Sequence, residues 1–120
     1  MADVVVTVPK WFGFRYWVAE GDPPGTPESG TEWDFSTAGG RPAIEVGERV
    51  YVVHNGLLRG YAPLTRLEWN GSRGAFIRRG GAVAVTIAEA IRGFRGWRYR
   101  WWERDVEIPF PDYATREIVP

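Results

Sequence analysis

The sequence predicts a mainly β protein, folded as a small closed or half-closed β-barrel with one or two short helices as its minor α component. Short β-branched and aromatic segments recur at even spacing, and glycine-rich turns separate them. Two Asn-Gly dipeptides, at 55–56 and 70–71, are preferred in tight turns between antiparallel strands. The 120 residues, 44% of them hydrophobic, suffice for one core, and no linker or repeat divides them, so residues 1–120 are predicted to form one domain.

In the first half of the chain, strands are predicted at Asp3–Val8 and Phe14–Glu20, because both segments are β-branched or aromatic. Residues 21–31 are rich in proline and glycine and are therefore predicted to be a loop. Trp33 and Phe35 follow as isolated apolar anchors, in a short helix or a pinned loop.

The second half contains the clearest hairpin signal. Arg49–Val53 and Leu57–Trp69 are predicted strands that flank the first Asn-Gly turn. Pro63 lacks an N–H, so the second of these strands is expected to bend, bulge or lie at an edge there. After the second Asn-Gly turn, two further short strands are predicted at Ala75–Arg79 and Ala82–Thr86.

The helices are expected near the end of the chain. Thr86 and Glu89 have the spacing of a capping box, which predicts a short helix from Thr86 to about Arg92. Arg98–Trp102 is the last predicted strand, and one helical turn is expected near Tyr113–Glu117.

The composition excludes several classes of site. Without cysteine, the chain cannot form disulfides, zinc–thiolate sites or a catalytic thiol, and the single histidine, His54, rules out a histidine-rich metal site. No cofactor is predicted. The formal net charge is zero, so the chain as a whole does not attract nucleic acid. No apolar stretch is long enough to span a bilayer, and a cytoplasmic protein without a membrane partner is expected.

The segment 91–104 is the most informative part of the sequence, because arginines alternate with large aromatic residues in it. On an extended strand one face would carry three rings, and the other would be mostly basic. The ring face is predicted to be interior, since burying three rings is more favourable than burying unpaired guanidinium groups. The ring on the basic face is then expected to be exposed and free to stack on a ligand. The ring face holds Trp97, Tyr99 and Trp101, and the basic face holds Arg98, Arg100 and Trp102.

Two interpretations of these arginines stay open at this point. They can follow a nucleic-acid backbone, or they can be neutralised by Glu103, Asp105 and Glu107 in surface ion pairs. The preceding run, Arg92-Gly-Phe-Arg-Gly96, favours the first interpretation, because glycines let the backbone approach a phosphate closely.

Three segments resemble PUA-like barrels of the ASCH and EVE types. They are Ile44–His54, with its Gly-Glu turn before a strand, the Gly-x-Ala step Gly60–Ala62, and Tyr16-Trp17-Val18. The resemblance implies a PUA-like barrel that binds RNA or a modified base. Lys10 and Trp11 with Arg15 match part of a segment of ASCH domains, without its glycine.

The resulting hypothesis is a domain that binds nucleic acid or a nucleotide, with RNA or another single strand as partner and a base held in an aromatic and arginine-lined cleft. One alternative is a modified-nucleoside amidohydrolase on the same fold, with Lys10 and Glu68 as two working groups. The expected threonine is absent, so no catalytic residue is assigned. Another is a protein-interaction module with exposed aromatics. The expected nucleic-acid-binding residues are Lys10, Trp11, Arg15, Arg92, Arg95, Arg98, Arg100 and Trp102.

Overall fold

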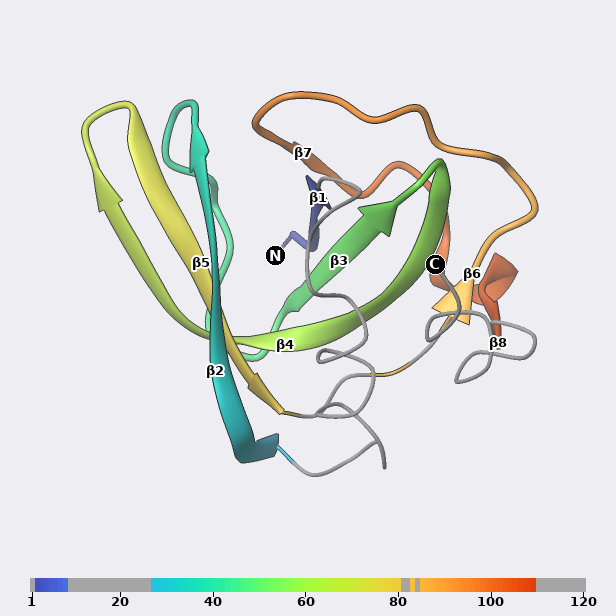
Figure 1. Ribbon diagram of the computed structural model, residues 1–120, viewed down its shortest axis with the longest axis horizontal. Coiled ribbons are helices and arrows are strands. Elements are labelled where there is room, and N and C mark those ends of the chain that lie inside the picture. Colours follow the sequence, from blue (N-terminus) through green and yellow to red (C-terminus); the bar gives the residue numbers. More distant parts are fainter. Residues whose placement is uncertain (1, 9–26, 81–82, 84, 110–120) are drawn as a thin grey trace.

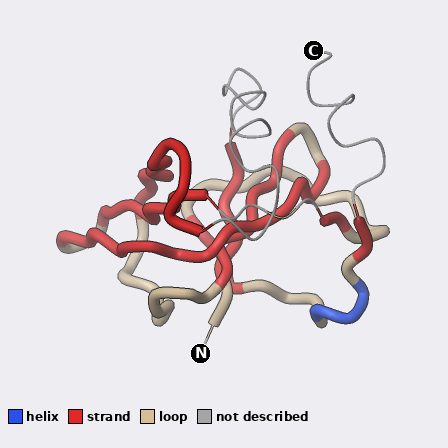
Figure 2. Tube along the Cα trace, turned by 90° about the horizontal axis from the view of Figure 1, so that it is seen from below, coloured by secondary structure: helices blue, strands red, loops and turns tan. Residues whose placement is uncertain are grey.

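A computed structural model of the protein describes residues 2–8, 27–80, 83 and 85–109. The mainly β prediction is confirmed: strands make up most of the described chain, and its only helix is one short 3₁₀ turn, η1 (Figures 1 and 2). The predicted strand at Phe14–Glu20 and the helical turn near Tyr113–Glu117 lie outside the described residues. In chain order the elements are β1 (Val4–Val8), β2 (Pro27–Ala38), β3 (Arg49–His54), β4 (Leu57–Asn70), β5 (Arg73–Gly80), β6 (Val85–Thr86), β7 (Trp97–Tyr99), η1 (Arg104–Val106) and β8 (Ile108–Pro109).

Six strands form one mixed sheet in the order β2-β5-β4-β3-β1-β7, and β6 pairs with β8 in a separate small sheet. β1 runs parallel to β3. All the other pairs of the large sheet, including β1 with β7, are antiparallel. The large sheet curls into a half-barrel, with β4 sweeping round from the β5 side to the β3 side (Figure 1). Its two edge strands, β2 and β7, therefore lie on opposite sides of an incompletely closed seam.

β4 forms the corner of this half-barrel, and Pro63 lies where its pairing changes. The residues up to Pro63 pair with β3, and those from Leu64 onward pair with β5. This change of partner confirms the irregularity expected at Pro63. A proline is tolerated there because its missing N–H costs no ladder hydrogen bond. The turn before β4 is also as predicted, because Asn55 and Gly56 both have positive φ, as a two-residue hairpin loop requires.

The predicted loop over residues 21–31 and the helix or pinned loop around Trp33 and Phe35 are wrong where β2 covers them. From Glu32 to Ala38, β2 pairs residue for residue with β5. In the described part of this segment, the proline and glycine residues coincide with an irregular register between Pro27 and Glu32. Pairing with a long neighbouring strand has outweighed the local composition.

The predicted helix from Thr86 to Arg92 is also wrong. Thr86 belongs to the β6–β8 ladder, so it does not cap a helix. The backbone N–H of Ile91 donates to the carbonyl of Gly56 at 2.9 Å, which ties this segment to the β3–β4 turn. Ile87 and Ile91 are both buried against the sheet. The segment is therefore stabilised by burying apolar side chains against the sheet, in place of the internal hydrogen bonds that a helix would have formed.

Both faces of β1 and β3 are buried, which explains their continuous apolar runs. An inner core inside the curl joins side chains of all the strands from β1 to β5, including Val6, Val52 and Phe76. An outer core lies on the other face of β1 and β3 and is covered by the segment that connects β6 to β7 and by Trp102.

Candidate nucleic-acid interface

The two edges of the sheet meet at one end of the seam. The indole N–H of Trp97 on β7 donates to the carbonyl of Gly40, just beyond β2, at 2.9 Å. The Tyr99 hydroxyl accepts from the backbone N–H of Ala43, also at 2.9 Å. Gly96 has φ +74°, and a Cβ there would lie 3.1 Å from the carbonyl oxygen of Ala38. Only glycine allows the chains to approach so closely in this conformation.

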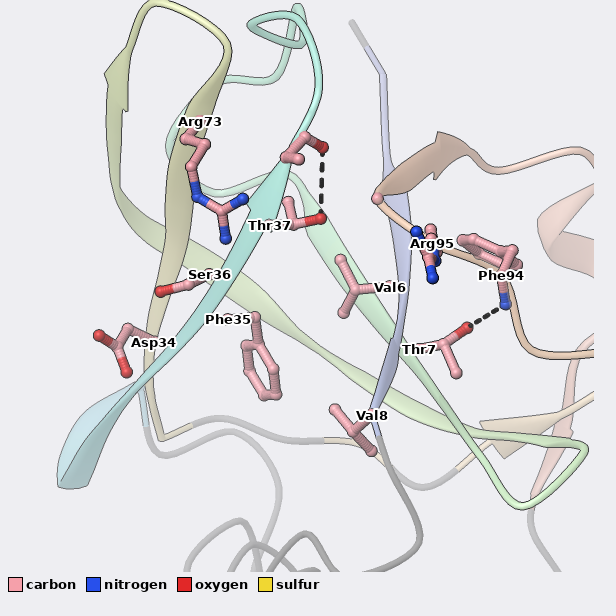
Figure 3. A pocket seen from close by; sticks show the side chains of 12 residues that line it. Val6, Thr7, Val8, Asp34, Phe35, Ser36, Thr37, Arg73, Phe94 and Arg95 are labelled. Carbon is pink, nitrogen blue, oxygen red and sulfur yellow. Dashed lines mark hydrogen bonds between the residues drawn. The ribbon is translucent and has the colours of Figure 1, made fainter.

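Beyond this contact the edges separate and leave a pocket of about 580 Å³, here called the seam groove. Val6 and Val8 of β1 face Phe35 and Thr37 of β2 across it (Figure 3). The valines and Phe35 belong to the inner core, so the floor of the groove is apolar. The groove is lined by Val6, Thr7, Val8, Asp34, Phe35, Ser36, Thr37, Ala38, Arg73, Phe94, Arg95 and Gly96.

The rim of the seam groove is polar and carries two arginines. Arg73 lies on the β2 side and Arg95 on the β1 side (Figure 3). Both are exposed, and neither forms an ion pair with any other residue in the described part of the chain. Among the described residues of the lining, Asp34 is the acidic one, so these residues together give the rim one net positive charge.

A third guanidinium group lies behind the floor. The Arg78 side chain is almost completely buried, and its guanidinium carbon is 4.9 Å from the centre of the Phe35 ring. One of its terminal nitrogens donates to the carbonyl of Val50 at 3.2 Å.

The arginines of segment 91–104 divide into two groups. Arg100 and Arg104 bind the buried carboxylate of Asp3, with shortest N···O distances of 3.0 and 2.8 Å. Burial raises the pKa of Asp3, but the hydrogen bonds from the Arg49 amide and these two arginines outweigh it and hold the pKa below its ordinary value. Arg100, expected to bind nucleic acid, is thus engaged in an internal ion pair.

The other three, Arg92, Arg95 and Arg98, are exposed and make no ion pair with described residues. Arg95 lines the seam groove, and the Arg98 guanidinium lies 4.4 Å from the centre of the Phe94 ring. The acids that follow in the sequence, Glu103, Asp105 and Glu107, therefore do not neutralise these three arginines in ion pairs. Lys10, Trp11 and Arg15 lie outside the described residues.

The predicted exposure of Trp102 is wrong, and so is the assignment of Tyr99 and Trp101 to the interior. Trp102 is 7% exposed, whereas Trp101 and Tyr99 are each 43% exposed. β7 ends at Tyr99 rather than Trp102, and burial does not alternate even within it, because Arg98 and Tyr99 are both exposed. The chain then leaves the sheet and turns Trp102 into the outer core.

Trp102 is fixed there by a buried carboxylate. Its indole N–H donates to Glu107 at 2.8 Å, and the Tyr51 hydroxyl donates to the same oxygen at 2.5 Å. Arg49 completes the cluster with an ion pair to Glu107 at 3.1 Å. Burial, together with the hydrogen bond to Glu107, raises the pKa of Tyr51, so the phenol remains a donor. Trp102 is therefore a structural residue and is not available for stacking.

The sequence did not indicate the β2 side of the groove, formed by Phe35, Thr37 and Arg73. Arg73 directly follows the turn after β4, and Phe35 lies in a segment expected to be irregular. The one usable signal was the alternation of apolar and polar residues from Trp33 to Ser36, which is typical of a half-buried strand.

The alternative working residue Glu68 is exposed and forms an ion pair with Arg66 at 2.8 Å. It is not part of the lining of the seam groove but lines a neighbouring hollow, which shares Ser36 and Arg73 with the groove. Among the described residues, no cluster of histidine and carboxylate groups suited to a metal ion is found. None of the described segments forms a helix long and apolar enough to cross a membrane.

Comparison with family models, curated proteins and solved structures returned no match for this chain. The PUA-like resemblance therefore stays an expectation from the sequence.

Proposed function

We propose that the protein binds nucleic acid or a nucleotide, with one base and its phosphate held in the seam groove. The observation that carries the proposal is the combination of an apolar floor with two exposed arginines, Arg73 and Arg95, on its opposite sides. Guanidinium groups that are not engaged by carboxylates are available for bidentate contacts with phosphate.

The other features of the groove suit a base. Its volume of about 580 Å³ lies within the range of roughly 300–1,000 Å³ that is usual for small-molecule sites. The floor residues Val6, Val8 and Phe35 can exclude water from one face of a ring. The hydroxyls of Ser36 and Thr37 and the carboxylate of Asp34 offer polar groups to the base edge or the sugar.

The proposal is tested by the affinity of the protein for single-stranded RNA and DNA oligonucleotides and for free nucleotides at low salt. The double variant Arg73→Ala/Arg95→Ala is expected to bind at least tenfold more weakly. The matched control Arg41→Ala/Arg66→Ala loses the same charge from exposed positions outside the groove and is expected to bind as the unmodified protein does. Equal affinities of the two double variants, or no binding by the unmodified protein, would refute the proposal.

A further inference from the structure

We infer that the ligand of the seam groove is a single strand of at least two nucleotides rather than a free mononucleotide. The inference rests on the proposed function and deepens it. It comes from a second ring site, formed by Phe94, Arg98 and Trp101, that begins at the lip of the groove.

Phe94 connects the two sites. It lines the seam groove, and its ring centre lies 6.4 Å from that of Trp101, with the ring planes inclined at 68°. Trp101 in turn packs edge to face on the buried Trp102, at 5.0 Å between centres. These two contacts hold the Trp101 ring in place while 43% of the residue stays exposed. A large ring that is both fixed and exposed is the arrangement used to stack an unpaired base.

The charges around this second site favour a polyanion. Arg98 covers Phe94, Arg95 follows Phe94 directly in the chain, and Arg92 lies two residues before it. All three are exposed and without an ion pair among the described residues. The next two arginines along the chain are instead bound to Asp3. Within segment 91–104, the arginines without such an ion pair are therefore the ones that precede Trp101 and lie near Phe94 in the chain.

Phe94 joins the groove to the exposed ring, because it lines the groove and its ring centre lies 6.4 Å from that of Trp101. A strand with one base in the groove can therefore place a neighbouring base, unstacked and splayed, on Trp101, as single strands bound to protein do. A mononucleotide has one base and can use only one of the two sites.

The test compares homotrinucleotides of RNA and DNA with the matching nucleoside monophosphates, by calorimetry or fluorescence anisotropy. Stacking on a second ring is expected to give the best trinucleotide a roughly 5- to 150-fold advantage over its mononucleotide. Trp101→Ala should remove most of that advantage and leave mononucleotide affinity unchanged. Trp101→Phe should keep most of it, because it retains a ring. Val106→Ala, which trims another exposed apolar residue, serves as the control and should change neither affinity.

Different failures identify different errors. If mononucleotides bind as tightly as trinucleotides, the inference is wrong while the proposed function stands. The same holds if Trp101→Ala weakens both ligands equally or neither. If no oligonucleotide or mononucleotide binds the unmodified protein, the proposed function fails and the inference fails with it.

Discussion

Replacing Trp102 by alanine should destabilise the protein far more than replacing the adjacent Trp101. Trp102 is 7% exposed, packs edge to face on Tyr51 at 5.1 Å between ring centres, and donates its indole N–H to Glu107. Truncating a buried tryptophan costs about 3–5 kcal/mol. Losing one hydrogen bond to the carboxylate adds about 1 kcal/mol, since Glu107 keeps its other two partners. The expected loss is therefore about 4–6 kcal/mol.

Trp101→Ala should cost no more than about 1 kcal/mol, because almost half of this residue is exposed. The assay is urea unfolding followed by far-UV circular dichroism, with the free energy of unfolding extrapolated to water. A total stability of about 5–15 kcal/mol is usual, so Trp102→Ala can be largely unfolded. Trp102→Phe, which keeps a ring but not the N–H, is the second variant and should lose about 1–3 kcal/mol. A larger loss for Trp101→Ala than for Trp102→Ala would refute the assigned orientation of both rings.

Two further predictions concern the parts that hold the seam and the N-terminal strand. Asp3→Asn should lower the free energy of unfolding by about 1–3 kcal/mol at neutral pH. Because folding lowers the pKa of Asp3, its contribution is present above the unfolded pKa of about 3.9 and is lost as the pH falls through the lower folded value. In urea unfolding at a series of pH values, the free energies of unfolding of the unmodified protein and of Asp3→Asn should therefore converge below about pH 4. A difference between them that does not change with pH would contradict this role of Asp3. Gly96→Ala should lower the free energy of unfolding by about 1–3 kcal/mol in the same assay, because Gly96 has a positive φ and lies close to the Ala38 carbonyl. Gly40→Ala is the control, because a Cβ there would meet open space, and it should lower the free energy of unfolding by less than about 0.5 kcal/mol. Equal costs for the two glycine variants would show that the seam is not tightly closed there.

Local signals in the sequence were sufficient for much of the fold. The Asn55-Gly56 turn and the strands on either side of it follow from turn chemistry and β-propensity, which act within a few residues. The bend at Pro63 follows from its missing N–H. The failures arose where distant parts of the chain decide the structure. β2 exists because β5 is available to pair with it, and the segment after Thr86 is extended because it covers the outer core.

The site was predictable only on one side. Arg95 and Arg98 stand in a segment whose composition indicates a binding role, and both remain free of ion pairs with described residues. Arg100 has the same sequence context, but Asp3, nearly a hundred residues away in the chain, binds it. Arg73 reaches the groove through the pairing of β2 with β5. Neither the ion pair between Asp3 and Arg100 nor the pairing of β2 with β5 can be predicted from the local sequence pattern.

The salt dependence of oligonucleotide binding tests the central claim, that the seam groove contacts a phosphate backbone, most directly. For a single strand, each neutralised phosphate contributes about −0.7 to the slope of the logarithm of the association constant against the logarithm of salt concentration. If Arg73 and Arg95 each neutralise one phosphate, the slope of Arg73→Ala/Arg95→Ala should be shallower than that of the unmodified protein by about 1.4. The slope of Arg41→Ala/Arg66→Ala should not change. Identical slopes for all three proteins would contradict the claim.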